Sequence, residues 1–312
     1  IEVARVLGWA VVVKKGEFKV GDKVVYCEVD SILPDKPEFD FLRDRSFRIK
    51  TIKLRGQFSQ GICFPLSILP EGEYSEDDDV TDILGVTKYE PPIPTELAGD
   101  AKGNFPSFIP KTDETRVQVL QKVLTKYKGT KCYITEKLEG TSATYYVNNG
   151  EFGVCSRNLE IKESDKNTLW KIAKANNIED KLRSLNRNIA IQGEVIGSGI
   201  QGNIYNLNSN AERELYFFNA FDIDTNAYLS LNELKGLVRQ LGLNLVPILS
   251  EKYVLEDDID KLVEMSIGYS VLNKKTRREG IVIRPVEEIS DIYFGRVSFK
   301  AINPEYLLKS KL

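Results

Sequence analysis

The chain has 312 residues, of which 42% are hydrophobic and 29% charged, and its formal net charge at pH 7 is −3. This length allows two domains of an ordinary globular protein, and no apolar run approaches the roughly 18 residues that a membrane span requires. The sequence contains no histidine, which excludes histidine-dependent nucleophile pairs, histidine general bases and histidine metal ligands.

The absence of histidine leaves acid–base chemistry to Lys, Asp, Glu or Tyr. A metal would need oxygen ligands, which favours Mg²⁺ or Mn²⁺. The four cysteines show no paired metal-ligand spacing, which favours free thiols in a reducing compartment such as the cytoplasm. No signal-peptide pattern is visible, and we expect no membrane partner. The net charge is not typical of a nucleic-acid-binding protein, so the local distribution of basic residues matters more.

Short β-type runs separated by turns occupy the beginning of the chain, at residues 3–13, 24–29, 48–54 and 62–65. Such strands indicate a small all-β barrel or sandwich over residues 1–90. Basic residues interleaved with aromatic and aliphatic ones crowd one span of this region. They are Arg43, Arg45, Arg48, Lys50, Lys53 and Arg55. Two interpretations remain open: a solvated strand face, or a phosphate-tracking surface of an OB-type barrel that binds nucleic acid.

Residues 91–112 are rich in Pro and Gly and lack periodicity, which predicts a linker between residues 1–90 and a second domain at residues 113–312. The Thr115-x-x-Gln118 pattern fits a capping box and predicts a helix that starts near Thr115. Composition predicts further helices within residues 161–185 and 231–241. The second domain therefore mixes helices and strands.

Lys137 lies three residues before Gly140, between two β-type runs. This spacing suggests a nucleophilic amine at the end of a strand, because lysine is a competent covalent nucleophile once its environment deprotonates it. On its own the pattern also fits a surface turn.

Four segments downstream add to this pattern. Ser156-Arg157-Asn158 follows a strand and places a guanidinium where a phosphate or ribose can be bound. Glu194 lies in an otherwise apolar strand at residues 189–197, where a carboxylate needs a partner. Residues 214–223 form an aromatic strand, in which Phe217 is expected in the core and one ring at the end can stack on a base. Residues 278–284 and 297–300 carry charges at positions that packing alone does not explain.

In this order the segments resemble the covalent nucleotidyltransferases, the polynucleotide ligases and mRNA capping enzymes. Lys137-Leu138-Glu139-Gly140 is similar to their lysine motif, Lys-x-Asp-Gly. The remaining motifs follow in order at Ser156-Arg157, Glu194, Phe221 before Asp222, Glu279-Gly280-Ile281-Val282-Ile283 and Lys300. Any single match is weak, but six in the family's order are a strong resemblance.

Two features narrow the resemblance. Residues 197–203 are similar to a segment typical of RNA ligases, and the chain continues for only twelve residues after Lys300. We expect no C-terminal OB domain, which DNA ligases and capping enzymes carry, and no C-terminal helical domain of the second RNA ligase family. An OB-like module in front resembles the fifth RNA ligase family. The implied fold class is α+β, with an N-terminal OB-type barrel before an ATP-grasp-like nucleotidyltransferase domain of antiparallel sheets and flanking helices.

The resemblance implies an ATP-dependent RNA ligase that uses Mg²⁺ or Mn²⁺. Lys137 would attack ATP, AMP would move to a 5′-phosphate, and a 3′-OH would attack the adenylate in a nicked duplex whose 3′-OH strand is RNA. Lys300 would hold the α-phosphate, and Glu194 and Glu279 would position the metal waters and the ribose. The other implied ATP contacts are Glu136 to the adenine amino group, Phe221 stacked on adenine, and Glu139, Arg157, Asn158 and Arg284. A metal ion, nearby cations and burial would lower the pKa of Lys137.

Two residues depart from the family's pattern. Glu139 replaces the usual Asp, and Ser298 stands at the first Lys of the fifth motif, with Arg284 or Arg296 as possible compensation. These departures leave open a non-catalytic RNA-binding protein with a degenerate transferase domain. A DNA ligase or a capping-type guanylyltransferase is a further alternative, although the expected lack of a C-terminal OB domain argues against both. We expect the protein to act as a monomer.

Overall fold

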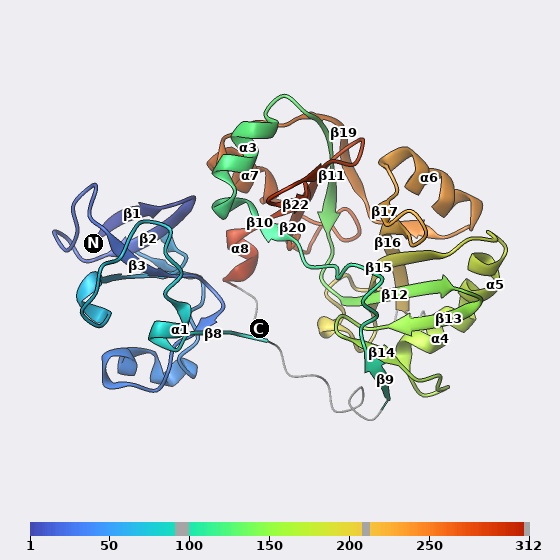
Figure 1. The fold of residues 1–312 in the computed structure, drawn as a ribbon, viewed down its shortest axis with the longest axis horizontal. Coiled ribbons are helices and arrows are strands. Elements are labelled where there is room, and N and C mark those ends of the chain that lie inside the picture. The colour runs from blue at the N-terminus through green and yellow to red at the C-terminus, as the bar shows by residue number, and fades with distance from the viewer. Residues whose placement is uncertain (91–99, 208–212, 309–312) are drawn as a thin grey trace. The chain divides into compact units, whose positions relative to one another are not determined.

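The computed structural model describes residues 1–90, 100–207 and 213–308, and the chain divides into two compact units. One unit comprises residues 1–92 with 307–312, and the other comprises residues 93–306 (Figure 1). Within the described residues, no helix is long and apolar enough to cross a membrane.

The first unit is built from short antiparallel strand pairs around one apolar core. The pairs are β1 (Glu2–Val6) with β2 (Trp9–Val13), β3 (Val24–Cys27) with β7 (Ile62–Pro65), β4 (Ser31–Ile32) with β8 (Thr87–Lys88), and β5 (Ile52–Leu54) with β6 (Gln57–Ser59). Buried and half-buried residues alternate along β2 because successive side chains of a strand point to opposite faces. Its inward residues include Trp9, which is 0% exposed.

Short helices complete the first unit. They are the 3₁₀ helices η1 (Pro37–Arg45) and η2 (Leu66–Ile68), and α1 (Thr81–Leu84). η1 starts with a proline, which has the backbone angle that a first helical turn requires. It ends at Ser46 in the left-handed region, with φ of 51°. Phe39 and Leu42 of η1 are buried in the core, whereas its basic residues stay outside.

The second unit contains two antiparallel-rich sheets. The five-stranded sheet has the order β10 (Thr115–Arg116), β23 (Phe299–Ile302), β20 (Gly280–Pro285), β11 (Lys131–Lys137), β19 (Ile248–Val254). The eight-stranded sheet includes β17 (Ala227–Tyr228), β16 (Arg213–Asp222), β15 (Ile189–Gly197), β12 (Thr141–Asn148), β13 (Glu151–Cys155), β14 (Leu159–Ile161) and β9 (Ala101–Asn104), with β18 (Asn244–Leu245) paired to β16. A hairpin is formed by β21 (Ser290–Asp291) and β22 (Gly295–Arg296).

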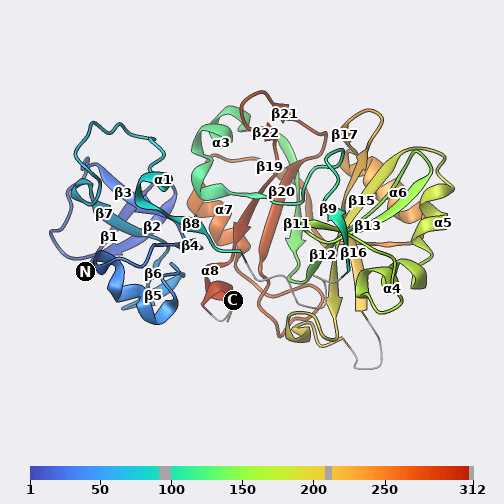
Figure 2. The same ribbon diagram turned by 60° about the horizontal axis from the view of Figure 1, so that its bottom comes forward.

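Helices pack on the apolar faces of these sheets (Figures 1 and 2). α3 (Gln121–Tyr127) and α7 (Ile259–Ser266) contribute to the core of the five-stranded sheet. α4 (Thr168–Ala175), α5 (Ile178–Arg183) and α6 (Leu231–Gln240) contribute to the core of the eight-stranded sheet, which includes Phe217 as predicted. Other short helices of the described residues are η3 (Val117–Val119), η4 (Gln201–Asn203) and α8 (Pro304–Leu307).

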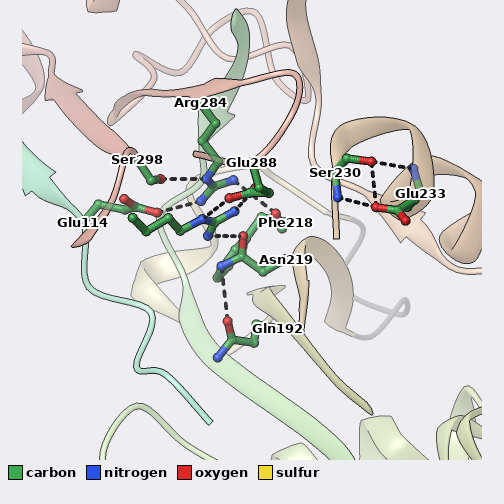
Figure 3. A network of polar contacts seen from close by, with 10 residues as sticks. Glu114, Gln192, Phe218, Asn219, Ser230, Glu233, Arg284, Glu288 and Ser298 are labelled. Carbon is green, nitrogen blue, oxygen red and sulfur yellow. Dashed lines mark hydrogen bonds and ion pairs between the residues drawn. The ribbon is translucent and has the colours of Figure 1, made fainter. Parts of the chain in front are cut away.

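The predicted helix start near Thr115 is wrong. Thr115 and Arg116 form β10, which pairs in parallel with Phe299 and Lys300 of β23, and the helix begins only at Gln121. Pairing with a distant strand therefore overrides the local capping pattern. Within residues 161–185, the predicted helix is two helices, because Asn177 adopts the left-handed region with φ of 51°. The helix predicted at residues 231–241 is α6, which starts with a capping box formed by Ser230 and Glu233 (Figure 3).

The predicted linker, residues 91–112, lies partly outside the described residues. Its described part carries β9, which pairs with β14 in the eight-stranded sheet of the second unit. The four cysteines are free and buried. Burial raises the pKa of Cys27 and Cys132 to about 12 and that of Cys63 to about 11. These thiols are therefore protonated at neutral pH.

Candidate active site

The chain passes from one sheet of the second unit to the other at the lysine motif. Lys137 is the last residue of β11, and β12 begins four residues later at Thr141. Gly140 lies in this crossing, and a Cβ atom there would come within 2.2 Å of the Val195 carbonyl oxygen. Glycine is therefore required at this position by the close approach of the two backbones.

Strand register brings three further charged residues to Lys137. Lys137 pairs with Gly280 beside Glu279, Val282 pairs with Lys300, and Ser142 pairs with Glu194. Lys137 Nζ lies 2.7 Å from Oε1 and 2.8 Å from Oε2 of Glu279. The side chains of this pair are 27% and 17% exposed, so both are sheltered but accessible to a ligand.

The protonation of Lys137 differs from the sequence-based expectation. Burial acts to lower the pKa of its ammonium group, but the negative charges of Glu279 and Glu194 outweigh burial, and the pKa is raised. Lys137 is thus held as a cation in the free protein. An amine that must attack as a neutral nucleophile would have to be released from these carboxylates.

The pKa values of Glu194 and Lys300 are shifted toward their neutral forms. In a stable ion pair the pKa of a glutamate falls and that of a lysine rises, so both shifts are opposite to those of an ion pair. Burial raises the pKa of Glu194 to about 8, although Lys137 and the Gly140 N–H favour its charged form. Burial lowers the pKa of Lys300 to about 8, assisted by the positive charges of Lys137 and Arg116. Within the residues that the structure describes, the ammonium group of Lys300 makes no hydrogen bond or ion pair. An anion bound here would relieve this uncompensated charge.

Arg116 is a residue of the site that the sequence reasoning missed. It pairs with Lys300 in the parallel β10–β23 register, and its charge contributes to the lowered pKa of Lys300. No local pattern around Arg116 indicates a site. Only its pairing with a strand about 180 residues further along the chain does so.

Glu136 presents a buried acceptor next to the nucleophile. The residue is 1% exposed, and its Oε2 accepts a hydrogen bond from the Val271 N–H at 2.8 Å. Its Oε1 is buried and has no hydrogen-bond partner. Burial raises the pKa of Glu136, against hydrogen bonds from Ser270 and Val271. A buried acceptor without a partner fits a ligand that donates a hydrogen bond, as an amino group does.

Glu139 is fixed by two tyrosines that the sequence reasoning also missed. The Glu139 N–H donates to the Tyr205 hydroxyl at 2.7 Å, and the Tyr306 hydroxyl bonds to the Glu139 side chain. Burial raises the pKa of Glu139. Tyr205 is 4% exposed and belongs to the segment that follows the predicted RNA-ligase-like residues 197–203. The backbone of the lysine motif is therefore held by a side chain from that segment.

Three predicted ATP contacts lie on the eight-stranded sheet or its loops. Arg157 forms an ion pair with Asp113 at 2.7 Å and is 45% exposed. Asn158 accepts a hydrogen bond from Lys111 Nζ at 3.2 Å. Phe221 is 2% exposed, and its ring contacts Tyr228 edge-to-face at 5.0 Å. A stacking role for Phe221 thus requires that its ring be uncovered, and it stays a prediction.

Arg284 lies in a closed network rather than facing an open site (Figure 3). It is 2% exposed and forms an ion pair with Glu114 at 2.7 Å. Its other donors bond to Ser298 Oγ at 2.9 Å and to the Phe218 carbonyl at 3.1 Å. A lysine at position 298 would place a second cation against the guanidinium, whereas Ser298 accepts a hydrogen bond from it.

Arg296 is also paired with other residues of the protein. It forms an ion pair with Glu288 at 2.5 Å and donates to Asn219 at 2.9 Å, and Asn219 donates in turn to Gln192. Its guanidinium also lies 3.5 Å from the centroid of the Tyr228 ring. The sequence suggested that Arg284 or Arg296 compensates for Ser298 by binding a phosphate. Either arginine could do so only if its ion pair, with Glu114 or Glu288, were broken.

Two of the six predicted nucleic-acid contacts of the first unit form ion pairs within that unit, and a third lies over an aromatic ring. Arg43 forms ion pairs with Asp35 and Asp40, both at 2.6 Å. Arg48 is 12% exposed, pairs with Asp30 at 2.8 Å, and lies 3.5 Å from the centroid of the Tyr89 ring. Lys53 lies over the Phe58 ring at 5.0 Å. Arg45, Lys50 and Arg55 form no ion pair within the described residues.

Comparisons with known proteins agree with this architecture. A family model described as RNA ligase matches residues 130–302, and an OB-fold domain model matches residues 1–66. The RNA ligase of Naegleria gruberi, solved as a lysine-to-alanine variant with ATP and Mn, aligns with a TM-score of 0.90 and 41% identity. The alignment covers 99% of this chain and 93% of that chain.

Two further structures of the Naegleria gruberi ligase, a lysine-to-methionine variant with AMP and Mn and the protein with PPi, align with TM-scores of 0.89 and 0.88. Both are 41% identical and cover 99% of this chain and 93% of that chain. No curated protein matches the chain.

The fold and the site together define an enzyme of the polynucleotide ligase class. More particularly, the chain belongs to the RNA ligase family. The predicted family and the predicted fold class, an OB-type barrel followed by a nucleotidyltransferase domain, are confirmed. The predicted use of ATP and a divalent metal agrees with the ligands of the Naegleria gruberi structures.

Proposed function

We propose that this RNA ligase forms a covalent lysyl-AMP on Lys137, transfers the AMP to a 5′-phosphate and joins that end to a 3′-OH. The substrate we propose is a nick in a duplex whose 3′-OH strand is RNA. The observation that carries the proposal is the lysine pair at the strand ends: Lys137 paired with Glu279, and Lys300 without a partner among the described residues.

The first step requires Lys137 to become neutral. Glu279, in contact with the ammonium at 2.7 Å, is placed to accept its proton. Lys137 Nζ then attacks the α-phosphorus of ATP. A P–N bond forms, the bond between that phosphorus and the bridging oxygen breaks, and pyrophosphate leaves. Lys300 supplies positive charge for the phosphate oxygens where charge accumulates in the transition state.

In the second step the 5′-phosphate oxygen attacks the same phosphorus, and the Lys137–phosphorus bond breaks. In the third step the 3′-OH oxygen attacks the phosphorus of the 5′-phosphate. An O–P bond forms, the bond between that phosphorus and the oxygen it shares with AMP breaks, AMP leaves, and the hydroxyl proton passes to a carboxylate of the site or to water. Neither step needs a histidine, since the groups that change protonation are a lysine and carboxylates. Glu194, whose pKa is raised to about 8, can hold or release a proton near neutral pH.

The residues present fit ATP and one divalent cation. The buried, unbonded Oε1 of Glu136 suits the adenine amino group and disfavours guanine, which has a carbonyl at the equivalent place. Among the described residues, no group of three or more Asp, Glu or Cys side chains is arranged so that it could hold a metal ion by itself. Glu194 and Glu279 would therefore hold the metal together with phosphates and water, as Mg²⁺ prefers. The metal would neutralise phosphate charge when bound.

The proposal is tested by the intact mass of the protein after incubation with ATP or GTP and either Mg²⁺ or Mn²⁺. We expect an AMP adduct with ATP, none with GTP, and none in Lys137→Ala. The matched control is Lys131→Ala, an exposed lysine at the start of the same strand, which should form the adduct normally. An adduct that persists in Lys137→Ala, or no adduct with either metal, would contradict the proposal. The second result would favour a degenerate transferase domain that only binds RNA.

A sealing assay then tests the substrate. A labelled nick with an RNA 3′-OH strand should be joined, and the same nick with a DNA 3′-OH strand should be joined much more slowly. Equal rates would contradict the proposed strand preference. We further propose that the protein acts as a monomer in a reducing compartment, which its four buried free thiols support. Size-exclusion chromatography with light scattering checks the monomer.

A further inference from the structure

Residues 112–116, here named the bridging segment, connect the two sheets of the second unit. At one end, the hydroxyl oxygens of Thr112 and Ser142 lie 3.1 Å apart, and Ser142 belongs to β12 of the eight-stranded sheet. At the other end, Arg116 of β10 pairs with Lys300 of the five-stranded sheet. The bridging segment contains none of the six sequence motifs, yet it lies against strands that do.

Asp113 lies within the bridging segment and is fixed from both sides. On one side, Thr112 is held by Ser142. On the other side, Glu114 forms its ion pair with Arg284 at 2.7 Å, and the Arg284 side chain is only 2% exposed (Figure 3). The backbone that carries the Asp113 carboxylate is therefore held in place, because both of its neighbours are anchored to the sheets.

The Asp113 carboxylate contacts one motif residue directly. Its Oδ1 accepts a hydrogen bond from Nη2 of Arg157 at 2.7 Å. Arg157 lies in the loop between β13 and β14, and its guanidinium makes no other hydrogen bond or ion pair within the described residues. A guanidinium has five donors in one plane. A bond to one of them therefore orients the group and leaves the others available for a ligand.

Asp113 also acts on Lys300. Burial lowers the pKa of Lys300 to about 8, and the negative charge of Asp113 acts against this shift. One fixed carboxylate is thus near the cations of two different motifs, Arg157 and Lys300. A phosphate group has several oxygen atoms that accept hydrogen bonds at the same time. It is therefore a ligand that an arginine and a lysine can bind together.

The bond between Asp113 and Arg157 contributes little to the stability of the fold. The two side chains are 51% and 45% exposed, and ion pairs this exposed have small effects on stability because water screens both charges. The neighbouring pair of Glu114 and Arg284 is sheltered. Adjacent acidic residues of the bridging segment therefore have different roles: Glu114 stabilises the fold, whereas the bond of Asp113 is not needed for folding.

We propose that Asp113 is a positioning residue of the ligase, which holds the Arg157 guanidinium so that its remaining donors bind a substrate phosphate together with Lys300. The inference rests on the proposed function and adds to it a residue outside the six motifs. Asp113 does not attract the phosphate, because both groups are negative. Its contribution is the orientation of Arg157, so it affects the rate of adenylyl transfer more than the binding of ATP.

The test measures single-turnover formation of the AMP adduct by the full chain over a range of ATP concentrations with Mg²⁺. Asp113→Ala should lower the maximum rate by about 5- to 50-fold, because a misplaced binding group costs up to about 100-fold. The ATP concentration for half-maximal rate should not rise, since a negative charge near the phosphates is removed. Asp113→Asn keeps an acceptor oxygen in the same place. It should lower the rate by only about 2- to 4-fold, because a neutral acceptor bonds about half as strongly.

A double-mutant cycle with Arg157→Ala tests whether Asp113 acts through Arg157. In that background Asp113→Ala should slow the adduct by less than about 2-fold, because the residue that it positions is already gone. The matched control is Glu179→Ala, which breaks a pair with Arg183 on α5 that is also 2.7 Å long and half-exposed. This control should form the adduct at the unmodified rate. Neither Asp113→Ala nor Glu179→Ala should change the midpoint of urea denaturation appreciably.

The same slowing by Asp113→Ala with and without Arg157 would overturn the inference. So would a faster rate in Asp113→Ala, which would mean that Asp113 competes with the phosphate for Arg157. A clearly lower urea midpoint in Asp113→Ala than in Glu179→Ala would assign Asp113 a structural role instead. Absence of the adduct from the unmodified protein would contradict the proposed function, and the inference would fall with it. A normal adduct in both the unmodified protein and Asp113→Ala would overturn the inference alone.

Discussion

Two groups of sheltered charges lie on the five-stranded sheet of the second unit, and they differ in how completely the charges are compensated. In the group around Arg284, the guanidinium bonds to Glu114, Ser298 and the Phe218 carbonyl. In the group around Lys137, Lys300 has no partner among the described residues, and Glu136 Oε1 has none either. The first group is complete without a ligand, and the second is not.

The same difference appears in the carboxylates. The pKa of Glu114 is lowered, because the charges of Arg284 and Arg296 outweigh its burial. The pKa of Glu194 is raised to about 8, because burial and the charge of Glu279 outweigh Lys137. Two buried glutamates in one unit therefore prefer opposite protonation states. This contrast indicates which group holds the fold together and which group is available for chemistry.

The largest effect on stability is expected from Glu114→Ala, which leaves the Arg284 charge buried without a partner. The loss should be about 3–5 kcal/mol in the free energy of unfolding, measured by urea denaturation at pH 7. Glu251→Ala is the control, since Glu251 forms an exposed pair with Lys235 and should cost about 0–1 kcal/mol. A loss below about 1 kcal/mol for Glu114→Ala would show that the network is not structural.

The pH dependence of this pair has a definite sign. The folded-state pKa of Glu114 is below its ordinary value, so its contribution is fully present above the unfolded pKa and is lost as pH falls through the folded pKa. The stability difference between the unmodified protein and Glu114→Gln should therefore shrink in acid. A difference that grows in acid would contradict the assigned charge state.

Lys300→Met should have the opposite profile, with a large loss of activity and little loss of stability. Adduct formation should slow by about 10²–10³-fold, as when one group that stabilises transition-state charge is removed. The unfolding free energy should not fall, because the ammonium is half-buried without a partner. Single-turnover adduct formation and urea denaturation measure the two quantities. The control is Lys252→Met, at an exposed lysine of β19. If Lys300→Met formed the adduct as fast as Lys252→Met, Lys300 would not belong to the active site.

Tyr205→Phe should have an intermediate effect by loosening the lysine motif. It removes the acceptor of the Glu139 N–H, a hydrogen bond that contributes about 0.5–1.5 kcal/mol. We expect the maximum rate of adduct formation to fall by about 2- to 10-fold, with little change in the ATP concentration for half-maximal rate. Tyr293→Phe, at a residue 91% exposed, is the control. A change only in the ATP requirement would argue against a positioning role.

Glu279→Gln should lose rate at every pH, because it removes the proposed proton acceptor of Lys137, but the position of its pH profile should move only slightly, which is the smallest of the predicted effects. Glu279 helps to raise the pKa of Lys137, so adduct formation should increase with pH as the ammonium loses its proton. Removing the negative charge lowers that pKa, and the profile, normalised to its own maximum, should move to lower pH. A profile that moves to higher pH would mean that Glu279 does not set the charge of Lys137.

Much of the candidate site could be predicted from the sequence, because each motif lies at or beside a strand and the pairing of these strands brings the motifs together. Lys137, Glu194 and Lys300 lie on strands that pair directly or adjoin the crossing between sheets, and Glu279 immediately precedes one of them, β20. The sequence could not show which charged residues are already paired in the fold, because their partners lie far away along the chain. Glu114 and Arg284 are 170 residues apart, so nothing local marks Arg284 as already paired.

Short-range signals misled in the same way. The capping pattern at Thr115 is local, whereas the strand pairing that replaces it reaches Phe299. In the first unit, the cluster from Arg43 to Arg55 is visible in the sequence, but the carboxylates that occupy Arg43 and Arg48 are not assigned to them by spacing. The sequence therefore predicts how many charges a span carries, but not which of them are free to bind a ligand.

The burial of all four thiols has a practical consequence for experiments on this protein. Because the pKa values of Cys27, Cys63 and Cys132 are raised to about 11 or 12 by burial, thiol-directed dyes should react slowly with the folded chain. A single cysteine introduced on an exposed loop would then be labelled almost alone, without first replacing the native ones. The chain is thus suited to site-specific fluorescence, with which the encounter of each unit with an RNA end can be followed in real time.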